Sequence, residues 1–508
     1  MNAVDYFFEN TSTLEKNFLV GREEISYKDL YNDVIGLAAW LNENYGKEKN
    51  IFILSVNNLF FLKTYLAIIK SGNVCIPLDP ATEKDNFAYI HDLTKPDLIF
   101  ITPEVNRRLQ LNEDNLIFPD TLPEPGTKNH EPVTRNHEPV TRTEESKTTS
   151  SAKPNHEPGI FDSERCAELI FTSGSTGKPK GVILSHKNLI ANTRSIVEYL
   201  ELKEDDRMLV VLPFYYCYGL SLLHTHLRVG GSIVFNNSFI FLGAVINDLK
   251  NHECTGFAGI PSHFQILLRK SDTFKETAFP YLKYVTQAGG KLAPIFIDEF
   301  REAHPETKFI VMYGQTEATA RLSWLPPDIY LAKRGSIGKG IPNVELKVVN
   351  ADGEPVKPGE TGEVIARGDN IMSGYFHDPE GTAQALRRGW LYTGDLGTVD
   401  EEGYIFLTAR SKEIIKVRGK RISPKEIEAV ILAINGVIDV TIQGVEDDIE
   451  GEALKADIVI RKEMKGLITE QYVMDHCSKH LAMFKIPRFY DIHDNLTITA
   501  TGKKIKKS

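Results

Sequence analysis

Cysteine is scarce in this sequence of 508 residues, and its five cysteines lie far apart. They occur at Cys75, Cys166, Cys217, Cys254 and Cys477, with no Cys-x-x-Cys pair and no spacing typical of a metal site. This scatter argues against a disulfide framework and is typical of a protein from a reducing compartment.

The chain also lacks an excess of positive charge and a long apolar run. Its formal net charge of -10 argues against nucleic acid as a partner, because phosphate binding requires a basic surface. Apolar runs such as residues 51–56 are far shorter than the roughly 20 residues that cross a bilayer. The N-terminal residues include Asp5 and Glu9 and show no basic start before an apolar run. We therefore expect no signal peptide, no integral membrane segment and a cytoplasmic location.

What the sequence does contain is a regular alternation of strand-like and helix-like stretches. Ser26 and Asp29 have the spacing of a capping box, ahead of apolar residues that recur at helical intervals. The alternation predicts an α/β body with largely parallel sheets. Strands are expected at residues 51–56, 74–78, 209–212, 232–235, 282–287 and 308–312.

A segment at about residues 122–160 interrupts this alternation. No aromatic residue occurs between Phe118 and Phe161, and the heptapeptide Asn-His-Glu-Pro-Val-Thr-Arg occurs at 129–135 and again at 136–142. Such a composition cannot bury a core, so we expect a disordered surface insertion. The histidines of the repeats have no metal-ligand geometry, and we interpret them as a product of tandem duplication.

Two further changes in composition divide the rest of the chain. After about Gly335, glycines separate short alternating strands, which predicts a β-rich subdomain. After Arg410, the pattern predicts a compact α+β unit. We therefore predict a large N-terminal α/β domain at 1–409, with parallel sheets and a β-rich subdomain, and a small α+β C-terminal domain at 410–508. The elements expected in the small domain are helices at 424–434 and 468–481 and strands at 437–445, 453–460 and 488–492.

The strongest chemical signal is the sequence Thr-Ser-Gly-Ser-Thr-Gly-Lys-Pro-Lys-Gly at residues 172–181. Glycines let backbone amides approach an anion, hydroxyls donate hydrogen bonds, and lysines supply positive charge. A polyphosphate is the anion that uses all three together. The candidate phosphate-binding residues are Thr172, Ser173, Gly174, Ser175, Thr176, Gly177, Lys178 and Lys180.

The spacing of this loop differs from that of a Walker A loop. Gly174 lies only three residues before Gly177, and Pro179 follows Lys178 where Walker A has Ser or Thr. Apolar stretches at 167–171 and 181–184 predict a loop between two strands. A flexible Ser/Gly linker, the plainer alternative, rarely keeps such strands on both sides.

Residues 170–182 resemble the signature of the adenylate-forming ligase superfamily. That superfamily includes acyl-CoA synthetases, aryl-CoA ligases, carrier-protein-loading adenylation domains and firefly luciferase. Further segments resemble its later motifs in the family order, so that the resemblance covers nearly the whole chain except the repeat insertion. These segments are Tyr313-Gly-Gln-Thr-Glu-Ala318, Tyr392-Thr-Gly-Asp395, residues 410–428 and Thr499-Ala-Thr-Gly-Lys503.

The resemblance implies nucleotide-binding roles for residues in these motifs. It places Mg²⁺ on Glu317, a hard oxygen ligand, and the α-phosphate of ATP on Thr316. It has Asp395 accept hydrogen bonds from the ribose hydroxyls, with Arg410 facing the ribose and phosphate. The other residues that it assigns to the ATP or AMP site are Gly289, Gly290, Tyr313, Gly314 and Gln315.

The resemblance also implies a catalytic lysine and a mobile C-terminal domain. Lys503 corresponds to the lysine that reaches over the substrate carboxylate and the α-phosphate, and Thr316 acts with it. A solvated tail is the plainer interpretation of the lysines near the C-terminus. Lys412 corresponds to the hinge about which the small domain rotates, and Gly419 to the face that then turns toward the thiol.

The implied reaction joins a carboxylic acid to a thiol through an acyl-adenylate, with ATP, Mg²⁺ and CoA. Residues 212–219 contain no acidic side chain to pair with a substrate amine, and their aromatic content favours a fatty or aromatic acid. Tyr216 and Ala288 are the candidates for the acyl pocket, whereas His224 and His226 are expected to be structural. We expect a monomer or homodimer.

Three alternatives to a CoA ligase remain open from the sequence. The acceptor thiol could be the phosphopantetheine of an acyl carrier protein. A non-catalytic relative that binds only nucleotide or acyl ligand is a second alternative, which the presence of Glu317, Asp395, Arg410 and Lys503 argues against. A light-emitting oxygenase similar to luciferase is the third.

Overall fold

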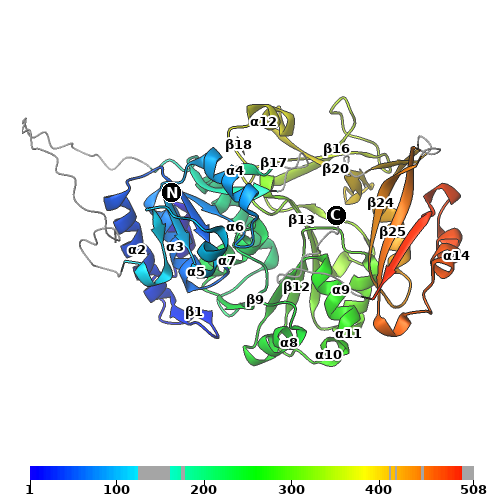
Figure 1. Ribbon diagram of the computed structural model, residues 1–508, viewed down its shortest axis with the longest axis horizontal. Coiled ribbons are helices and arrows are strands. Elements are labelled where there is room, and N and C mark those ends of the chain that lie inside the picture. The colour runs from blue at the N-terminus through cyan, green and yellow to red at the C-terminus, as the bar shows by residue number, and fades with distance from the viewer. Residues whose placement is uncertain (124–160, 173–177, 411–413, 418–419, 448–450, 495–508) are drawn as a thin grey trace, which may run out of the picture.

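Figure 1 shows a computed structural model of the chain, with the blue N-terminal part at one end of the long axis, the smaller C-terminal unit at the other, and the β16–β17–β20 sheet above the strands β12 and β13 between them. The structure describes residues 1–123, 161–172, 178–410, 414–417, 420–447 and 451–494. The repeats of the predicted insertion therefore lie outside the described residues. So do several candidate site residues, which are named below.

The first sheet has seven strands in the order β18-β8-β7-β4-β3-β5-β6. The strands from β7 to β6 run parallel, whereas β8 is antiparallel to both β7 and β18. The bounds are β3 (Asn50–Leu54), β4 (Val74–Pro77), β5 (Leu98–Ile101), β6 (Leu116–Ile117), β7 (Cys166–Thr172), β8 (Lys180–Ser185) and β18 (Gly374–Tyr375).

The second sheet has nine strands in the order β15-β14-β13-β12-β11-β9-β10-β1-β2. The six strands from β13 to β1 are parallel, so the prediction of an α/β body with largely parallel sheets is confirmed. The bounds are β1 (Asn17–Val20), β2 (Ile25–Ser26), β9 (Arg207–Val210), β10 (Ser232–Phe235), β11 (Gly256–Gly259), β12 (Tyr284–Gln287), β13 (Lys308–Tyr313), β14 (Ser323–Leu325) and β15 (Lys339–Gly340).

One predicted strand is displaced. The strand expected at 209–212 is β9, which ends at Val210. Leu212 is buried, as a strand residue would be, but its carbonyl accepts a hydrogen bond from Asn57 Nδ2 at 2.9 Å. The Phe214 N–H donates to Asn57 Oδ1 at 2.8 Å, so a side chain replaces the strand partner at this turn.

Helices pack on and between these sheets. The capped helix expected after Ser26 is confirmed as α2, because the Ser26 side chain accepts from the Asp29 N–H. Helices α1, α3, α6 and α7 pack against one another, and their buried faces join the core that spans both sheets. None of the helices that the structure describes is long and apolar enough to cross a membrane. The bounds are α1 (Ala3–Phe8), α2 (Tyr27–Asn44), α3 (Leu59–Ser71), α4 (Lys84–Thr94), α5 (Pro103–Leu109), α6 (His186–Leu200), α7 (Cys217–Val229), α8 (Leu242–Asn251), α9 (Pro261–Lys270), α10 (Asp272–Glu276) and α11 (Pro294–Ala303).

The β-rich subdomain predicted after Gly335 is a five-stranded antiparallel sheet. The elements expected after Arg410 are also present, as a three-stranded sheet with two helices and a short hairpin. The bounds are β16 (Val344–Val349), β17 (Gly362–Gly368), α12 (Pro379–Ala385), β19 (Leu386–Arg387), β20 (Trp390–Val399), β21 (Ile405–Arg410), β22 (Ile415–Val417), β23 (Lys420–Ile422), α13 (Pro424–Leu432), β24 (Val437–Asp447), β25 (Gly451–Ile460), α14 (Glu470–His480) and β26 (Phe489–His493).

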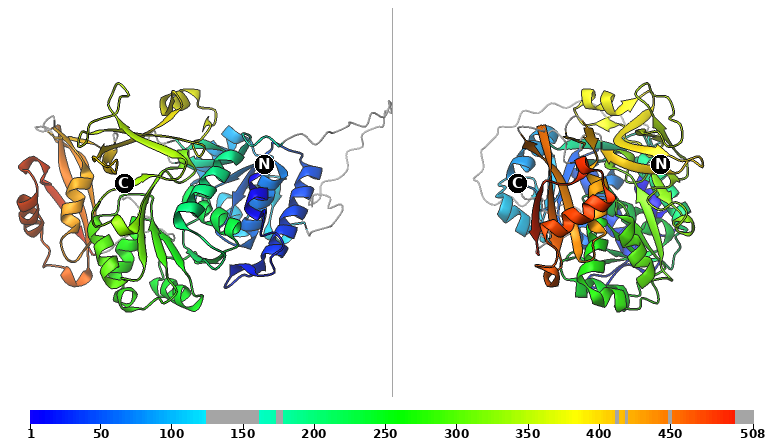
Figure 2. Two further views of the ribbon diagram at one scale, coloured as in Figure 1. Left: turned by 180° about the vertical axis from the view of Figure 1, so that it is seen from behind. Right: turned by 90° about the vertical axis from the view of Figure 1, so that its right-hand side faces the viewer.

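Arg269 of α9 joins the C-terminal unit to the larger body. Figures 1 and 2 show this unit at one end of the molecule, where β24 packs beside α9. The Arg269 side chain is buried and pairs with Glu299 of α11. It also donates to the backbone carbonyls of Val437 at 2.7 Å and Ile434 at 3.5 Å, so a single guanidinium contacts both units.

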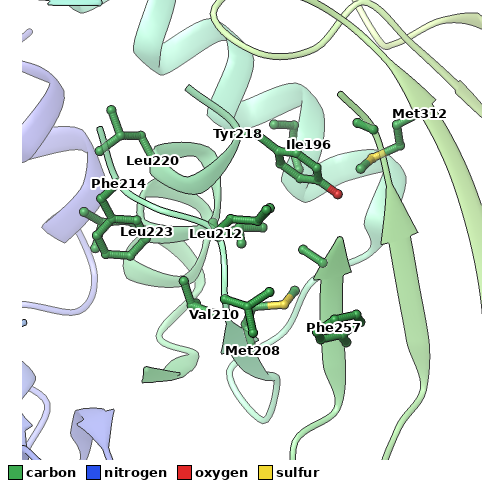
Figure 3. Close-up of a cluster of buried hydrophobic side chains, with 14 of the residues drawn as sticks. Ile196, Met208, Val210, Leu212, Phe214, Tyr218, Leu220, Leu223, Phe257 and Met312 are labelled. Carbon is green, nitrogen blue, oxygen red and sulfur yellow. The ribbon is translucent and has the colours of Figure 1, made fainter. Parts of the chain in front are cut away.

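Helix α7 begins at a tight turn that tolerates no side chain at its third residue. A Cβ at Gly219 would lie 2.2 Å from the carbonyl oxygen of Pro213. The core around this turn includes Leu212, Phe214 and Tyr218 (Figure 3). Glycine is therefore required if α7 is to begin against the turn that follows β9.

We predict that Gly219→Ala lowers the free energy of unfolding by about 1–3 kcal/mol, because the methyl group must displace backbone atoms. Gly243→Ala is the matched control, since Gly243 also lies in the first turn of a helix but its Cβ would meet nothing within 4 Å. The control is expected to be neutral or more stable by up to about 1 kcal/mol. Thermal melting of both variants checks this, and equal melting temperatures would contradict it.

Candidate functional site

The predicted phosphate loop connects two strands, as the apolar stretches on both sides of it indicated. Strands β7 and β8 form an antiparallel hairpin in which Thr172 pairs with Lys180. Of the candidates within the loop, Ser173, Gly174, Ser175, Thr176 and Gly177 lie outside the described residues. The described residues nearest to the end of the hairpin are Thr172 on one side and Lys178 and Lys180 on the other.

Both lysines of the hairpin have aromatic neighbours. Lys180 Nζ lies 2.7 Å from Asp378 Oδ2 and 4.9 Å from the ring centroid of Tyr375. Lys178 Nζ lies 5.3 Å from the ring centroid of Tyr89. The Lys180–Asp378 pair is about one-third exposed, so it orients the ammonium more than it stabilises the fold.

Glu317 meets this hairpin through Tyr375. Glu317 lies in a short 3₁₀ helix, Thr316–Ala318, which follows the carboxyl end of β13. The Tyr375 hydroxyl donates to Glu317 Oε1 at 2.8 Å, and Tyr375 belongs to β18, which pairs with β8. The two motifs that the sequence places far apart thus come together at one tyrosine. Sequence reasoning identified neither Tyr375 nor Asp378, because each lies outside the segments that carry the resemblance.

Asp395 is buried and accepts two hydrogen bonds. The Tyr313 hydroxyl donates to Asp395 Oδ2 at 2.7 Å, and Arg410 Nε donates to Asp395 Oδ1 at 2.8 Å. Burial and the neighbouring Asp395 charge raise the pKa of Tyr313 well above its usual value, so the tyrosine stays protonated as a donor. Three residues named from separate motifs therefore form one network.

Glycines allow the loops around these residues to approach closely. Gly289 has a φ of +81°, which disfavours a side chain, and the carbonyl of Gly290 accepts from Gln287 Nε2 at 2.8 Å. A Cβ at Gly314 would lie 1.9 Å from the carbonyl oxygen of Ala320. Backbone geometry thus explains Gly289 and Gly314, whereas a Cβ at Gly290 would meet only the Pro261 side chain at 3.2 Å. Ala288, next to Gly289, is buried.

The first turn of α7 reaches the same region. Cys217 Sγ lies 3.6 Å from Thr316 Oγ1, which places the neighbouring Tyr216 near the Thr316 loop as well. Burial raises the pKa of Tyr216 to about 12. Gln315 precedes the 3₁₀ helix directly. Lys412, Gly419 and Lys503 lie outside the described residues, so their places in the site stay predictions.

A buried polar cluster supports both β7 and α7. The Tyr65 hydroxyl, on α3, donates to Glu168 Oε2 at 2.8 Å and lies 2.7 Å from His224 Nε2. Burial raises the pKa of Glu168 to about 7 and lowers that of His224 to about 3. His226 is also buried and bonds the Leu222 carbonyl, so both histidines have the structural surroundings that the sequence suggested.

Two family patterns match this chain. The AMP-binding enzyme family matches residues 8–376, and the AMP-binding enzyme C-terminal domain matches residues 426–503. These matches include the hairpin, the Tyr313–Ala318 segment and the segment that ends at Lys503.

Similar proteins include several CoA ligases. The chain is 30% identical over 450 residues to the oxalate–CoA ligase of Arabidopsis thaliana, covering 88% of this chain and 85% of that protein. It is 28% identical over 512 residues to a long-chain-fatty-acid–CoA ligase of Bacillus subtilis, covering 96% and 89%. The crystal structure of ATP-bound MatB from Rhodopseudomonas palustris has a TM-score of 0.82 at 24% identity, covering 99% and 97%, which shows a shared fold.

The Glu168 cluster predicts a pH dependence of stability. A carboxyl whose folded pKa is raised from 4.5 to about 7 binds its proton more tightly in the folded state, so its contribution to stability is lost as pH rises through that window. Glu168→Gln removes this loss. Relative to the unchanged protein, the variant is therefore expected to gain about 1.4 kcal/mol per pH unit between about pH 4.5 and 7.

Melting temperatures measured across this range check the prediction. Tyr65→Phe serves as the control, because it removes the hydroxyl that lowers the pKa of Glu168 but leaves the carboxyl in place. That variant should keep the pH dependence. A constant difference in melting temperature between Glu168→Gln and the unchanged protein would contradict the assignment.

Proposed function

Since the chain belongs to the AMP-binding enzyme family and is an ATP-dependent acid–CoA ligase, we propose how its residues divide the two half-reactions. The acid first attacks the α-phosphorus of ATP to give acyl-AMP and pyrophosphate, and the CoA thiol then takes the acyl group. The observation that carries the assignment is the meeting of the β7–β8 hairpin with Glu317 at Tyr375. Polyphosphate and its metal need loop amides and a carboxylate side by side, and this contact supports that arrangement.

The hairpin binds the β- and γ-phosphates, which leave as pyrophosphate. Thr172 to Gly177 supply hydroxyls and backbone amides, and Lys178 and Lys180 supply charge. Because Lys180 is already paired with Asp378, its ammonium is held in position before ATP binds. Positioning and charge neutralisation account for most of the catalysis of phosphoryl and nucleotidyl transfer.

Glu317 is the protein ligand for Mg²⁺ in this proposal. Its Oε1 accepts from Tyr375, which fixes the carboxylate and leaves Oε2 as a hard oxygen ligand. Among the residues that the structure describes, no group of three or more metal-ligating side chains occurs, so Glu317 would hold the metal together with the phosphates of ATP. When bound, Mg²⁺ neutralises phosphate charge. Thr316 contacts the α-phosphate from the adjacent position.

Asp395 holds the ribose. Tyr313 and Arg410 each donate to a different oxygen of its carboxylate, and each oxygen keeps a further lone pair for a ribose hydroxyl. The two donors also orient this buried carboxylate. The adenine and the acyl group lie against Ala288, Gly289 and Gly290, with Gly314 and Gln315 beside them.

In this proposal the C-terminal unit rotates between the two half-reactions. We place the domain boundary near residue 410, with Lys412 as the hinge, Lys503 over the α-phosphate during adenylation and Gly419 on the thiol side afterwards. A carrier-protein phosphopantetheine is the alternative acceptor to CoA. We also propose that the protein is a monomer or a homodimer. Its proposed location is the cytoplasm.

The acid in this proposal has an apolar acyl body. The first turn of α7 presents Tyr216 and Tyr218, and no acidic side chain occurs at residues 212–219 to pair with an amine. The relatives act on acids as different as oxalate and long-chain fatty acids, so kinship alone does not select the substrate. Aromatic side chains around the pocket favour a fatty or aromatic acid.

Acid-dependent exchange of pyrophosphate into ATP tests the function. We expect exchange only when a suitable acid is present, and subsequent thioester formation with CoA. Comparing CoA with a holo-acyl carrier protein distinguishes the two acceptors. Failure of a broad acid panel to support exchange would favour a non-catalytic binding protein.

We predict that Lys503→Ala lowers acyl-AMP formation by about 10²-fold or more, because charge developing on the α-phosphate loses its counter-charge. Thioester formation from supplied acyl-AMP should be nearly unchanged. Lys507→Ala is the control from the same lysine-rich end and should affect neither half-reaction. An equal loss of both half-reactions in Lys503→Ala would contradict the assignment of Lys503 to acyl-AMP formation.

A further inference from the structure

Arg321 is a buried arginine whose side chain lacks a carboxylate partner among the residues described. Only 2% of Arg321 is exposed. Its Nη1 donates to the Ala320 carbonyl at 3.1 Å and its Nη2 to Ser221 Oγ at 3.4 Å, while Nε has no hydrogen-bond partner. Arg269 is comparably buried but pairs with Glu299. Burial of a cation costs free energy unless an anion pairs with it, so an anion bound at Arg321 would offset this cost.

The surroundings of Arg321 supply no compensating negative charge. Its guanidinium lies 4.3 Å from the ring centroid of Tyr218, which contributes a cation–π contact. Burial raises the pKa of Tyr199 even though the Arg321 charge opposes this, so Tyr199 stays neutral. Tyr199 also hydrogen-bonds the Arg321 side chain, and Figure 3 shows the apolar Ile196 and Met312 next to Tyr218.

Arg321 lies at the proposed acyl pocket. Tyr218 reaches from α7 to β12, where its hydroxyl lies 2.9 Å from Thr286 Oγ1, two residues before Ala288. Cys217, next to Tyr218, contacts Thr316 of the reacting end. The guanidinium therefore lies on the tyrosine face between the Thr316 loop and the end of β12.

The backbone before Arg321 is strained and held in place. Thr319 and Ala320 have φ values of 53° and 95°, which non-glycine residues rarely adopt. Asn370 Nδ2 fixes the loop by donating to the Arg321 carbonyl at 2.7 Å and to the Ala318 carbonyl at 3.2 Å. Gly314 leaves the room that the Ala320 carbonyl needs. Strain of this kind persists only where surrounding contacts impose it, and it is concentrated at functional sites.

We propose that Arg321 binds a second carboxylate, at the far end of the acid that this enzyme activates. The proposal rests on the proposed function and narrows its substrate to a dicarboxylic acid with an apolar body. The Nε and Nη2 groups form one edge of the guanidinium, where Nε has no hydrogen-bond partner and Nη2 makes a long bond to Ser221 Oγ at 3.4 Å. Such an edge matches a carboxylate in two parallel hydrogen bonds.

The test compares dicarboxylic acids with monocarboxylic acids of equal length in acid-dependent ATP–pyrophosphate exchange. Suitable pairs are glutarate with pentanoate, adipate with hexanoate and terephthalate with 4-methylbenzoate. We expect kcat/KM to favour the dicarboxylic member of at least one pair by about tenfold or more. Arg321→Met should abolish this preference mainly through KM, and Arg321→Lys should retain part of it, because a lysine keeps the charge but loses the fork.

Arg228→Met is the control, because Arg228 belongs to the last turn of α7, at the end opposite Tyr218, and pairs with Glu9. It should leave the preference unchanged. An ATP-dependent rise in melting temperature checks that each variant keeps its nucleotide site. If Arg321→Met fails this check, the inference is tested by the dicarboxylate preference of the unchanged protein and by its reduction in Arg321→Lys.

Two results would overturn the inference while leaving the proposed function intact. One is a preference of the unchanged protein for the monocarboxylic member of every pair. The other is a dicarboxylate preference that survives in Arg321→Met or is undiminished in Arg321→Lys. Absence of exchange with every acid would instead contradict the proposed function, and the inference would fall with it.

Discussion

The hydrogen bond from Tyr375 to Glu317 is the contact on which the candidate site depends. Tyr375 belongs to the seven-stranded sheet through its pairing with β8, whereas Glu317 follows β13 of the nine-stranded sheet. The segment before Tyr375 adds further ties, because the Met372 N–H donates to the Glu317 carbonyl and Asn370 holds the loop that ends at Arg321. One short segment therefore positions the candidate phosphate, metal and acyl residues relative to one another.

Beneath the site, a polar link passes through the core. Tyr65 contacts Glu168 on the strand that leads into the phosphate hairpin and His224 on the helix that lines the proposed acyl pocket. Burial keeps the histidine neutral and disfavours ionisation of the carboxyl, so the cluster holds little net charge where it could not be solvated. The two ends of the substrate site thus share one support within the hydrophobic core.

Much of the fold was predictable from the sequence, because local patterns are strong where they coincide with tertiary structure. Ser26 capped its helix as expected, and the apolar stretches at 167–171 and 181–184 correctly indicated two strands joined by a loop. The end of β9 was misplaced because the side chain of Asn57, distant in sequence, satisfies the backbone there. Tyr375, Asp378 and Arg321 were missed for the same reason, since each acquires its significance from partners that only the folded chain brings near.

The attachment of the C-terminal unit has an evolutionary consequence. Arg269 recognises this unit through the carbonyls of Ile434 and Val437, and every amino acid carries such a carbonyl. The side chains on the C-terminal side of this contact can therefore diverge without loss of the bond, provided that the turn between α13 and β24 keeps its shape. The junction therefore depends on backbone conformation and on the arginine with its Glu299 partner. Substitutions on the surface of the smaller unit leave this bond in place.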